Sequence, residues 1–426
     1  MARLKLAYIV LDGAADGPAP KRALDEAETP HLDRLAATSL CFGVYTIAPG
    51  VAPESDAAVL SLLGYDPHKY YTGRGPLEAV GAGIPFRDGQ VAFRANFATV
   101  DPRSMRIIDR RAGRSVTSVE ARMLAEALDG MELAGGEARA LFRATIGHRA
   151  VLVLSHRSSR LSASVSNSDP AYKRVGAISV ALRDYEPYIA KVEPLDDTPE
   201  ARLTAELANE FTRRAIEILD SHPVNEDRRR RGLLPANAVL LRDAGDRLPP
   251  VEPFRERFGL DMASIVEMVV ERGIARVLGL HDIPVEVEGR SRRDILVEEA
   301  EKAAQALERF DGVYVHLKGP DEPGHDGDFE AKKEAIEDID RHFFSRLLDL
   351  VDPTNILFIV TSDHATPWSL KAHSGDPVPL MFSNPRIGSG IQGFGETGCL
   401  ASARKVLEGG YNILPEALSV MESLGR

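Results

Sequence analysis

The distribution of apolar and polar residues predicts an α/β core built from both ends of the chain. Short apolar runs rich in β-branched residues, typical of buried parallel strands, occur near the amino terminus and again in the carboxyl-terminal half. Segments with helical periodicity separate the later runs, and this alternation indicates a parallel sheet covered on both faces. We expect strands at residues 4–11, 238–242, 275–280, 312–317 and 356–360, and helices near 260–272, 294–309 and 328–351.

The middle of the chain has a different pattern, which begins near Ile84. Residues 91–101 alternate between apolar and polar positions, as a half-exposed antiparallel strand does. A helix is expected at 117–129, followed by strand-like runs at 139–146 and 149–154. This order of elements predicts an α+β region inside the α/β chain.

The end of this middle region sets the expected domain boundaries. A long amphipathic helix is expected at 198–220, and residues 225–232, with four consecutive arginines, are expected to form a solvated connector. The sequence thus predicts a discontinuous α/β core of residues 1–85 and 236–426, with an inserted α+β domain of residues 86–235.

Composition and charge narrow the possible functions. The chain has 426 residues, of which 44% are hydrophobic and 27% charged, as in soluble globular proteins of two or three domains. The net charge of −12 argues against a nucleic-acid partner. Two cysteines, Cys41 and Cys399, cannot form a disulfide framework. Because no apolar run reaches the roughly 18 residues of a membrane span and no signal peptide is evident, we expect a cytoplasmic protein without a membrane partner.

Side chains that bind divalent cations follow three of the predicted strands. Ligands collect outside the carboxyl ends of strands in open α/β sheets, so these residues are expected at one edge. Carboxylate and imidazole groups together suit an ion such as Zn²⁺ or Mn²⁺. The candidates are Asp12, Asp321, His325, Asp363 and His364, with His373 on the following loop.

These residues are too many for one catalytic zinc with an open position, so they predict a two-metal site. Such a site stabilises both the attacking and the leaving oxygen of a phosphoryl transfer. One division places Asp321, His325 and His373 around one ion, and Asp12, Asp363 and His364 with the Ser55 oxygen around the other. The spacing alone leaves this assignment open.

Ser55 is expected at the start of a helix that ends at Gly64. A serine at this position is often only a helix cap. The functional alternative is a nucleophile, since the free N–H groups and the positive end of the helix dipole would receive a phosphate and favour an alkoxide.

Arginines are concentrated in the middle region, although the protein as a whole is acidic. The segment from Asp109 to Arg114 contains three arginines, and Arg94 precedes it on a predicted strand. They form either solvated faces or an anion-binding lid.

Together, these motifs resemble the alkaline phosphatase superfamily and, more closely, its cofactor-independent phosphoglycerate mutases of the archaeal type. The resemblance extends over nearly the whole chain. It rests on Leu11–Gly13, Pro53–Asp56, Leu62–Pro67, Asn96–Asp101, Asp109–Arg114, Asp321–Asp328 and Ser362–Pro367.

The resemblance implies an alkaline-phosphatase-like core and a smaller inserted lid domain. It also implies a mutase of glycolysis and gluconeogenesis that interconverts 3-phosphoglycerate and 2-phosphoglycerate without 2,3-bisphosphoglycerate. Ser55 would be the phosphorylated nucleophile, and Mn²⁺, or else Zn²⁺, Co²⁺ or Mg²⁺, would fill two sites. The implied metal ligands are Asp12, Ser55, Asp321, His325, Asp363, His364 and His373, and the candidate substrate-binding residues are Arg94, Asp109, Arg110, Arg111 and Arg114.

Three other functions are compatible with parts of this pattern. A homoserine-kinase-like phosphotransferase would need a nucleotide, for which the sequence shows no motif. A metal-dependent phosphohydrolase or phosphopentomutase would share the metal ligands. A catalytically silent metal-binding protein would not require Ser55 beside a full set of ligands.

Overall fold

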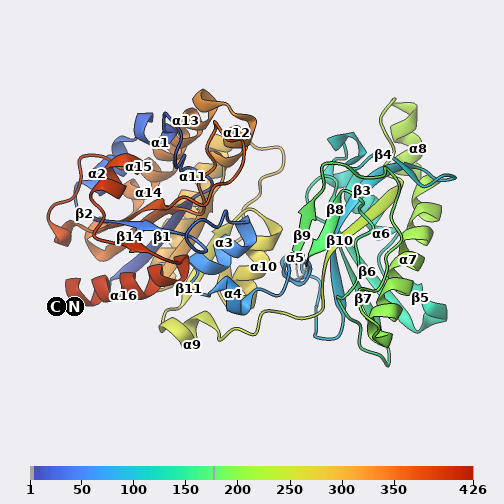
Figure 1. The fold of residues 1–426 in the computed structure, drawn as a ribbon. Coiled ribbons are helices and arrows are strands. Elements are labelled where there is room, and N and C mark those ends of the chain that lie inside the picture. The colour runs from blue at the N-terminus through green and yellow to red at the C-terminus, as the bar shows by residue number, and fades with distance from the viewer. Residues whose placement is uncertain (1–3, 176–177, 426) are drawn as a thin grey trace. The chain divides into compact units, whose positions relative to one another are not determined.

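The computed structural model describes residues 4–175 and 178–425, and its internal contacts divide the chain into two compact units. The first unit combines Met1–Tyr71 with Pro250–Arg426, and the second comprises Thr72–Pro249. Figure 1 shows a sheet with helices around it in each unit. Among the described residues, no helix is long and apolar enough to cross a membrane.

The first unit is built on an eight-stranded, mostly parallel sheet with the order β12-β11-β13-β1-β14-β15-β2-β16. At its centre β1 pairs in parallel with β13 on one side and β14 on the other, as the apolar runs predicted. The α/β fold class predicted from the sequence is therefore confirmed. The strands are β1 (Lys5–Leu11), β2 (Ser39–Val44), β11 (Met262–Val266), β12 (His281–Asp282), β13 (Gly312–Leu317), β14 (Ile356–Ser362), β15 (Val378–Ser383) and β16 (Val406–Leu407).

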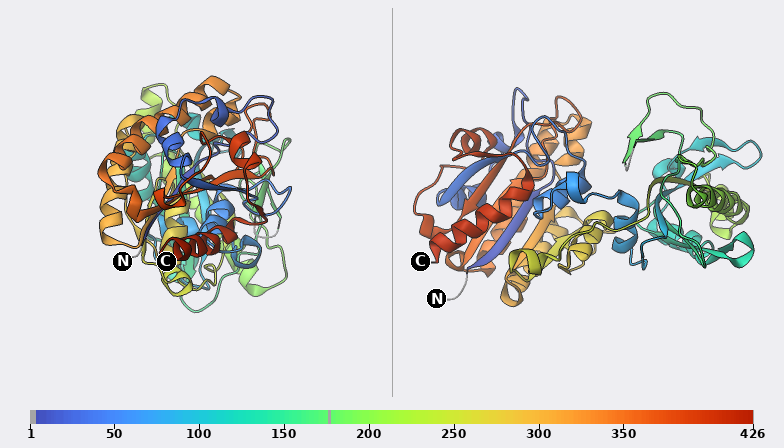
Figure 2. Two further views of the ribbon diagram at one scale, coloured as in Figure 1. Left: turned by 90° about the vertical axis from the view of Figure 1, so that its left-hand side faces the viewer. Right: turned by 60° about the horizontal axis from the view of Figure 1, so that its bottom comes forward.

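Helices cover both faces of this sheet. One hydrophobic cluster joins Ile9 and Leu11 of β1 to α11 and to the long helical segment from α13 to α14. In Figures 1 and 2, α3, α10 and α16 cover the other face. The helices are α1 (Ala23–Glu26), α2 (Pro30–Ala36), α3 (Ser55–Leu62), α4 (Pro67–Tyr70), α9 (Phe254–Phe258), α10 (Val269–Leu278), α11 (Arg292–Arg309), α12 (Asp321–Asp326), α13 (Phe329–Asp338), α14 (Ser345–Leu350), α15 (Glu396–Ala401) and α16 (Ile413–Leu424), with a π-helical turn over Ile339–Phe344.

The predicted helix near 260–272 and strand at 275–280 were wrong. The structure has the strand first, as β11, and then helix α10. Val270, Ile274 and Leu278 are buried at helical spacing, so the apolar residues that indicated a strand form the inner face of an amphipathic helix.

The second unit is built on an antiparallel sheet with the order β10-β3-β7-β6-β5, and β4 pairs with β3. The apolar run at 238–242, predicted to lie in the parallel sheet, is part of β10 and pairs antiparallel with β3. That assignment was wrong because a fully buried strand has the same pattern in either kind of sheet. The strands are β3 (Val91–Asp101), β4 (Arg106–Asp109), β5 (Met131–Leu133), β6 (Ala138–Ala144), β7 (Arg149–His156), β10 (Ala238–Gly245) and the separate hairpin β8 (Tyr172–Val175) and β9 (Ile178–Ala181).

Helices also cover both faces of the second sheet. α6 (Ser118–Glu126) and α7 (Pro199–Asp220) pack on one face, and α5 (Arg74–Gly81) packs near Ala92 and Val151 on the other. Strand β3 is therefore mostly buried instead of half-exposed as its alternation predicted.

The predicted solvated connector at 225–232 was also wrong. Most of it belongs to helix α8 (Pro223–Arg230). The Arg228 side chain is fully buried, lies 2.8 Å from a carboxylate oxygen of Glu120 and donates to the Ser115 carbonyl oxygen. The arginine-rich segment therefore includes a buried arginine, Arg228, that connects α8 to α6.

Candidate metal centre

The candidate site is assembled by the ends of three neighbouring parallel strands. In the register of the sheet, Leu11 lies beside Leu317 on one side and Ser362 on the other. The residues that follow these positions therefore emerge at the same edge. Asp12 and Asp363 directly follow the adjacent strands β1 and β14, at the one edge predicted from the sequence.

The first group of candidate ligands is Asp12, Asp363 and His364, and all three side chains are buried. The Nε2 atom of His364 lies 3.6 Å from Oδ1 of Asp12 and 3.2 Å from Oδ2 of Asp363. Each of these three atoms is buried without a hydrogen-bond partner. Because burying unpaired polar atoms is costly, this arrangement fits a divalent cation among them.

The second group is Asp321, His325 and His373. Both imidazole Nε2 atoms lie 3.5 Å from Oδ1 of Asp321 and 3.1 Å from each other. Asp321 and His325 sit four residues apart in helix α12, which replaces the tight loop expected there. Four-residue spacing places both side chains on one helix face, so this group also fits a cation.

The imidazole rings of both groups are oriented through their Nδ1 atoms. His373 Nδ1 lies 2.7 Å from the Pro53 carbonyl oxygen, and His325 Nδ1 lies 3.2 Å from that of Lys371. His364 Nδ1 lies 2.9 Å from Thr366 Oγ1. Partners of this kind fix the ring orientation of metal-binding histidines and leave Nε2 as the ligand atom.

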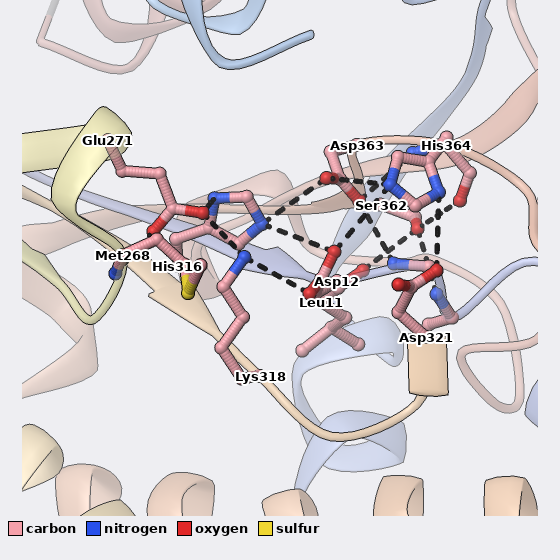
Figure 3. A network of polar contacts seen from close by, with 12 residues as sticks. Leu11, Asp12, Met268, Glu271, His316, Lys318, Asp321, Ser362, Asp363 and His364 are labelled. Atoms are coloured by element: carbon pink, nitrogen blue, oxygen red, sulfur yellow. Dashed lines mark hydrogen bonds and ion pairs between the residues drawn. The ribbon is translucent and has the colours of Figure 1, made fainter. Parts of the chain in front are cut away.

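Sequence patterns did not reveal three ionisable neighbours of the first group. His316 Nε2 lies 3.4 Å from Asp363 Oδ2, and Lys318 Nζ lies 3.0 Å from Asp12 Oδ2 and also contacts Glu271, as Figure 3 shows. His316 and Lys318 flank Leu317 at the end of β13, a signal available in the sequence. Glu271 comes from α10, whose position was predicted incorrectly.

These neighbours affect protonation within the group. Burial raises the pKa of Asp12 to about 6, although Lys318 opposes the shift. The pKa of Lys318 is raised because Asp12 and Glu271 outweigh its burial. A cation at Lys318 thus partly neutralises the buried carboxylates.

Ser55 is the first residue of α3, so the predicted helix start is confirmed. The cap position is occupied by Glu54 instead of Ser55. The preceding loop is tied to the second group, since Pro53 is the backbone partner of His373. Ser55 therefore follows closely after a residue that contacts the candidate metal centre.

The predicted substrate-binding residues lie in the second unit. Arg110 binds Asp169 through two nitrogens, one at 2.9 Å, and Asp109 accepts hydrogen bonds from the backbone of Arg111 and Gly113. Arg94 lies 3.1 Å from carboxylate oxygens of both Glu78 and Asp243. A surface pocket of about 480 Å³ is lined by Ile107, Ile108, Asp109, Arg110, Arg111, Arg114, Tyr185 and Pro187.

Two further arginines near Arg94 were not among the predicted substrate-binding residues. Arg242 of β10 pairs with Arg94 of β3, and Arg149 of β7 pairs with Asn96, two positions further along β3. Because paired residues and alternate residues of a strand share a face, all three arginines point to one face of the sheet. The Arg242 guanidinium lies 4.2 Å from the Tyr172 ring. Burial first, and then the positive charge of nearby arginines led by Arg149, lower the pKa of His148 to about 4.

Comparison with known proteins identifies the family. Residues 36–225 match the model of the 2,3-bisphosphoglycerate-independent phosphoglycerate mutase family. The mutase of this name from Aeropyrum pernix is 61% identical over 423 residues, which cover 98% of this chain and all of the relative. The chain belongs to this family. The Methanopyrus kandleri mutase is 44% identical over 383 residues, 88% of this chain and 86% of the relative.

Solved structures share the fold of this chain, and one of them is a named phosphoglycerate mutase. The cofactor-independent phosphoglycerate mutase from Thermoplasma acidophilum is 31% identical, covers 98% of this chain and 100% of its own, and has a TM-score of 0.65. A Pyrococcus horikoshii protein is 28% identical, covers 99% of this chain and 98% of its own, and has a TM-score of 0.78. The family and the enzyme class predicted from the sequence, a mutase independent of 2,3-bisphosphoglycerate, are confirmed.

Proposed function

We propose that this phosphoglycerate mutase interconverts 3-phosphoglycerate and 2-phosphoglycerate through a phosphoserine on Ser55, beside two divalent metal ions. One observation carries the proposal. Oδ1 of Asp12 and Oδ2 of Asp363 lie 3.6 and 3.2 Å from Nε2 of His364, and all three atoms are buried without hydrogen-bond partners. A cation at this place would satisfy all three.

The two groups would each hold one ion, Asp321, His325 and His373 in one and Asp12, Asp363 and His364, with Ser55, in the other. Their mixture of carboxylate and imidazole suits Mn²⁺, the metal expected from the sequence, and also Zn²⁺ or Co²⁺. When bound, such ions supply Lewis acidity and favour the ionised form of a hydroxyl group.

Ser55 would transfer the phosphoryl group in two steps. Its oxygen attacks the phosphorus of 3-phosphoglycerate and forms phosphoserine, while the bond from phosphorus to the 3-oxygen of glycerate breaks. The 3-oxygen takes up a proton to replace the one lost by Ser55, and glycerate with a free 3-hydroxyl group remains in the site. The glycerate then reorients within the site, and its 2-hydroxyl oxygen attacks the phosphoserine to regenerate Ser55. The backbone N–H groups at the start of α3 favour the phosphate at this position.

The second unit would bind the anionic groups of the substrate. Arginine forms bidentate hydrogen bonds with carboxylate and phosphate. Arg110 is already held by Asp169, and Asp109 orders the backbone of the loop that carries Arg111 and Arg114. Arg94, Asp109, Arg110, Arg111 and Arg114 therefore remain our candidates for substrate binding, and the lid role of this unit remains a prediction.

The test uses metal-stripped protein reloaded with Mn²⁺ and given 3-phosphoglycerate without bisphosphoglycerate. The assay follows 2-phosphoglycerate and free phosphate together, for the wild type, Ser55→Ala and the control Ser61→Ala from the same helix. We expect isomerisation with little free phosphate, lost in Ser55→Ala and retained in Ser61→Ala. Isomerisation that survives in Ser55→Ala would refute the phosphoserine mechanism, and release of phosphate alone would show a hydrolase.

The arginine proposal has its own measurement. Arg110→Ala and Arg111→Ala should each raise KM and increase the free phosphate released per turnover, since a loosely held glycerate allows water to attack the phosphoserine. Unchanged KM and unchanged phosphate release in both variants would exclude these residues from substrate binding.

A further inference from the structure

Thr366 lies between the two groups of candidate metal ligands and contacts both. Its hydroxyl oxygen is 2.7 Å from Oδ1 of Asp321 in the second group and 2.9 Å from Nδ1 of His364 in the first. Figure 3 shows Asp321 and His364 near each other at this edge of the sheet. The Thr366 side chain is fully buried, so no solvent replaces either contact.

The direction of these two hydrogen bonds follows from the chemistry of the groups. An ionised carboxylate only accepts hydrogen bonds, and a hydroxyl group has a single hydrogen to donate. If the Thr366 hydrogen goes to Asp321, its oxygen must accept from His364, and Nδ1 of His364 must carry a proton. The lone pair of His364 is then on Nε2, the atom that lies 3.2 Å from Asp363 and 3.6 Å from Asp12.

The position of Thr366 is fixed on several sides. Its backbone N–H donates to the Ala15 carbonyl oxygen at 2.9 Å, and the buried Lys332 ammonium group donates to its carbonyl oxygen at 2.8 Å. Gly13 and Gly324 pack closely against Thr366. A Cβ atom added to Gly13 would lie 2.7 Å from Oγ1 of Thr366, and one added to Gly324 would lie 2.9 Å from its Cγ2. The hydroxyl group is therefore held in place before any ion binds.

We propose that Thr366 is a positioning residue shared by both metal sites, whose single hydroxyl group orients Asp321 and selects the His364 tautomer that binds an ion through Nε2. The inference rests on the two metal sites of the proposed function and adds the residue that couples them. Outer partners of metal ligands typically contribute 10–100-fold to metal affinity.

The test titrates metal-stripped protein with Co²⁺ by calorimetry, so that affinity and stoichiometry are measured without reference to activity. Thr366→Val removes the hydroxyl group at nearly constant volume, and Thr366→Ser retains it. Thr361→Val is the matched control, because Thr361 is also buried, lies in β14 and donates to the Pro379 carbonyl oxygen at 2.8 Å.

We expect Thr366→Val to weaken binding of both ions by roughly 10–100-fold, while Thr366→Ser and Thr361→Val remain within about threefold of the wild type. Circular dichroism and thermal unfolding establish that each variant is folded. If Thr366→Val does not fold, Thr366→Ala against Thr366→Ser makes the same comparison, since both lack the methyl group.

If Thr366→Val binds both Co²⁺ ions with wild-type affinity, or binds only one of them more weakly, the shared role of Thr366 is overturned. The proposed metal sites themselves would be unaffected by that result. Equal weakening in Thr361→Val would overturn the shared role too, because the effect would then follow from replacing any buried threonine near these ligands. Wild-type protein that binds fewer than two Co²⁺ ions would instead refute the proposed metal sites themselves, and this inference with them.

Discussion

Metal binding at Asp321, His325 and His373 should depend steeply on pH because of His373. Its Nδ1 atom is 2.7 Å from the Pro53 carbonyl oxygen, so the proton that must leave for metal binding is the one on Nε2. Burial opposes the charged form of this ring, but Asp321 and the Pro53 carbonyl outweigh burial and raise the pKa of His373 to about 9. An ion must therefore displace a proton at neutral pH.

The size of the effect follows from the distance between pH and pKa. At pH 7, two units below a pKa of about 9, the affinity should be about 100-fold lower than for the deprotonated site, or about 2.7 kcal/mol. The free energy of unfolding of the metal-free protein has the opposite dependence. A pKa raised in the folded state gives a stabilising contribution that is full below the ordinary value of 6.5 and is lost as pH rises through about 9.

Calorimetric titration with Co²⁺ at pH 6.5, 7.25 and 8, in buffers of different ionisation enthalpy, measures affinity and protons released together. We expect the affinity at this group to rise about tenfold per pH unit, with about one proton released per ion. His373→Gln loses a ligand together with the imidazole proton, so it should bind Co²⁺ more weakly at this group and without that proton release. A flat affinity profile with no proton release in the wild type would refute the reasoning.

Other predictions concern the second unit and the packing of the site. Arg228→Met should lower the free energy of unfolding by about 3–5 kcal/mol in urea titrations, because it leaves buried acceptors unpaired, whereas the partly exposed Arg229→Met should change it by less than about 1 kcal/mol. NMR titration should give His148 a pKa of about 4. The contribution of His148 to the free energy of unfolding is then full above pH 6.5, its ordinary pKa, and is lost as the pH falls through about 4. Inorganic phosphate bound to the arginines should raise the pKa of His148. Gly13→Ala should abolish Co²⁺ binding in calorimetry, because its φ is +60° and its Cβ would lie 2.7 Å from Asp321 Oδ1.

Local sequence patterns were sufficient to predict the structure where it depends on a single apolar run or on the residues at the end of one strand. The apolar run at the amino terminus forms β1, and the residue after it, Asp12, lies beside Asp363 because parallel strands end at one edge. The structure places six candidate ligands in the two groups of three considered from the sequence, and their role as metal ligands stays a prediction. The arginine-rich segment after β4 lines a surface pocket, and its role in substrate binding stays a prediction.

Local patterns failed where pairing partners far apart in sequence decided the structure. A buried apolar run does not specify its neighbouring strand, so β10 was assigned to the wrong sheet. For the same reason the sequence predicted a helix followed by a strand where the structure has strand β11 followed by helix α10. The position of Glu271, which lies in α10, could therefore not be predicted. Arg228 reads as solvated because its partner Glu120 is more than a hundred residues away.

The amino-acid sequence by itself determined the family, the central strands and the identity of the candidate ligands, because these depend on residue type and on periodicity over a few residues. Only the tertiary structure decided which atoms face one another. His316, Lys318 and Thr366 contact the candidate ligands through packing of β13, α12 and the loop after β14, and distances of 2.7–3.4 Å are set by that packing alone.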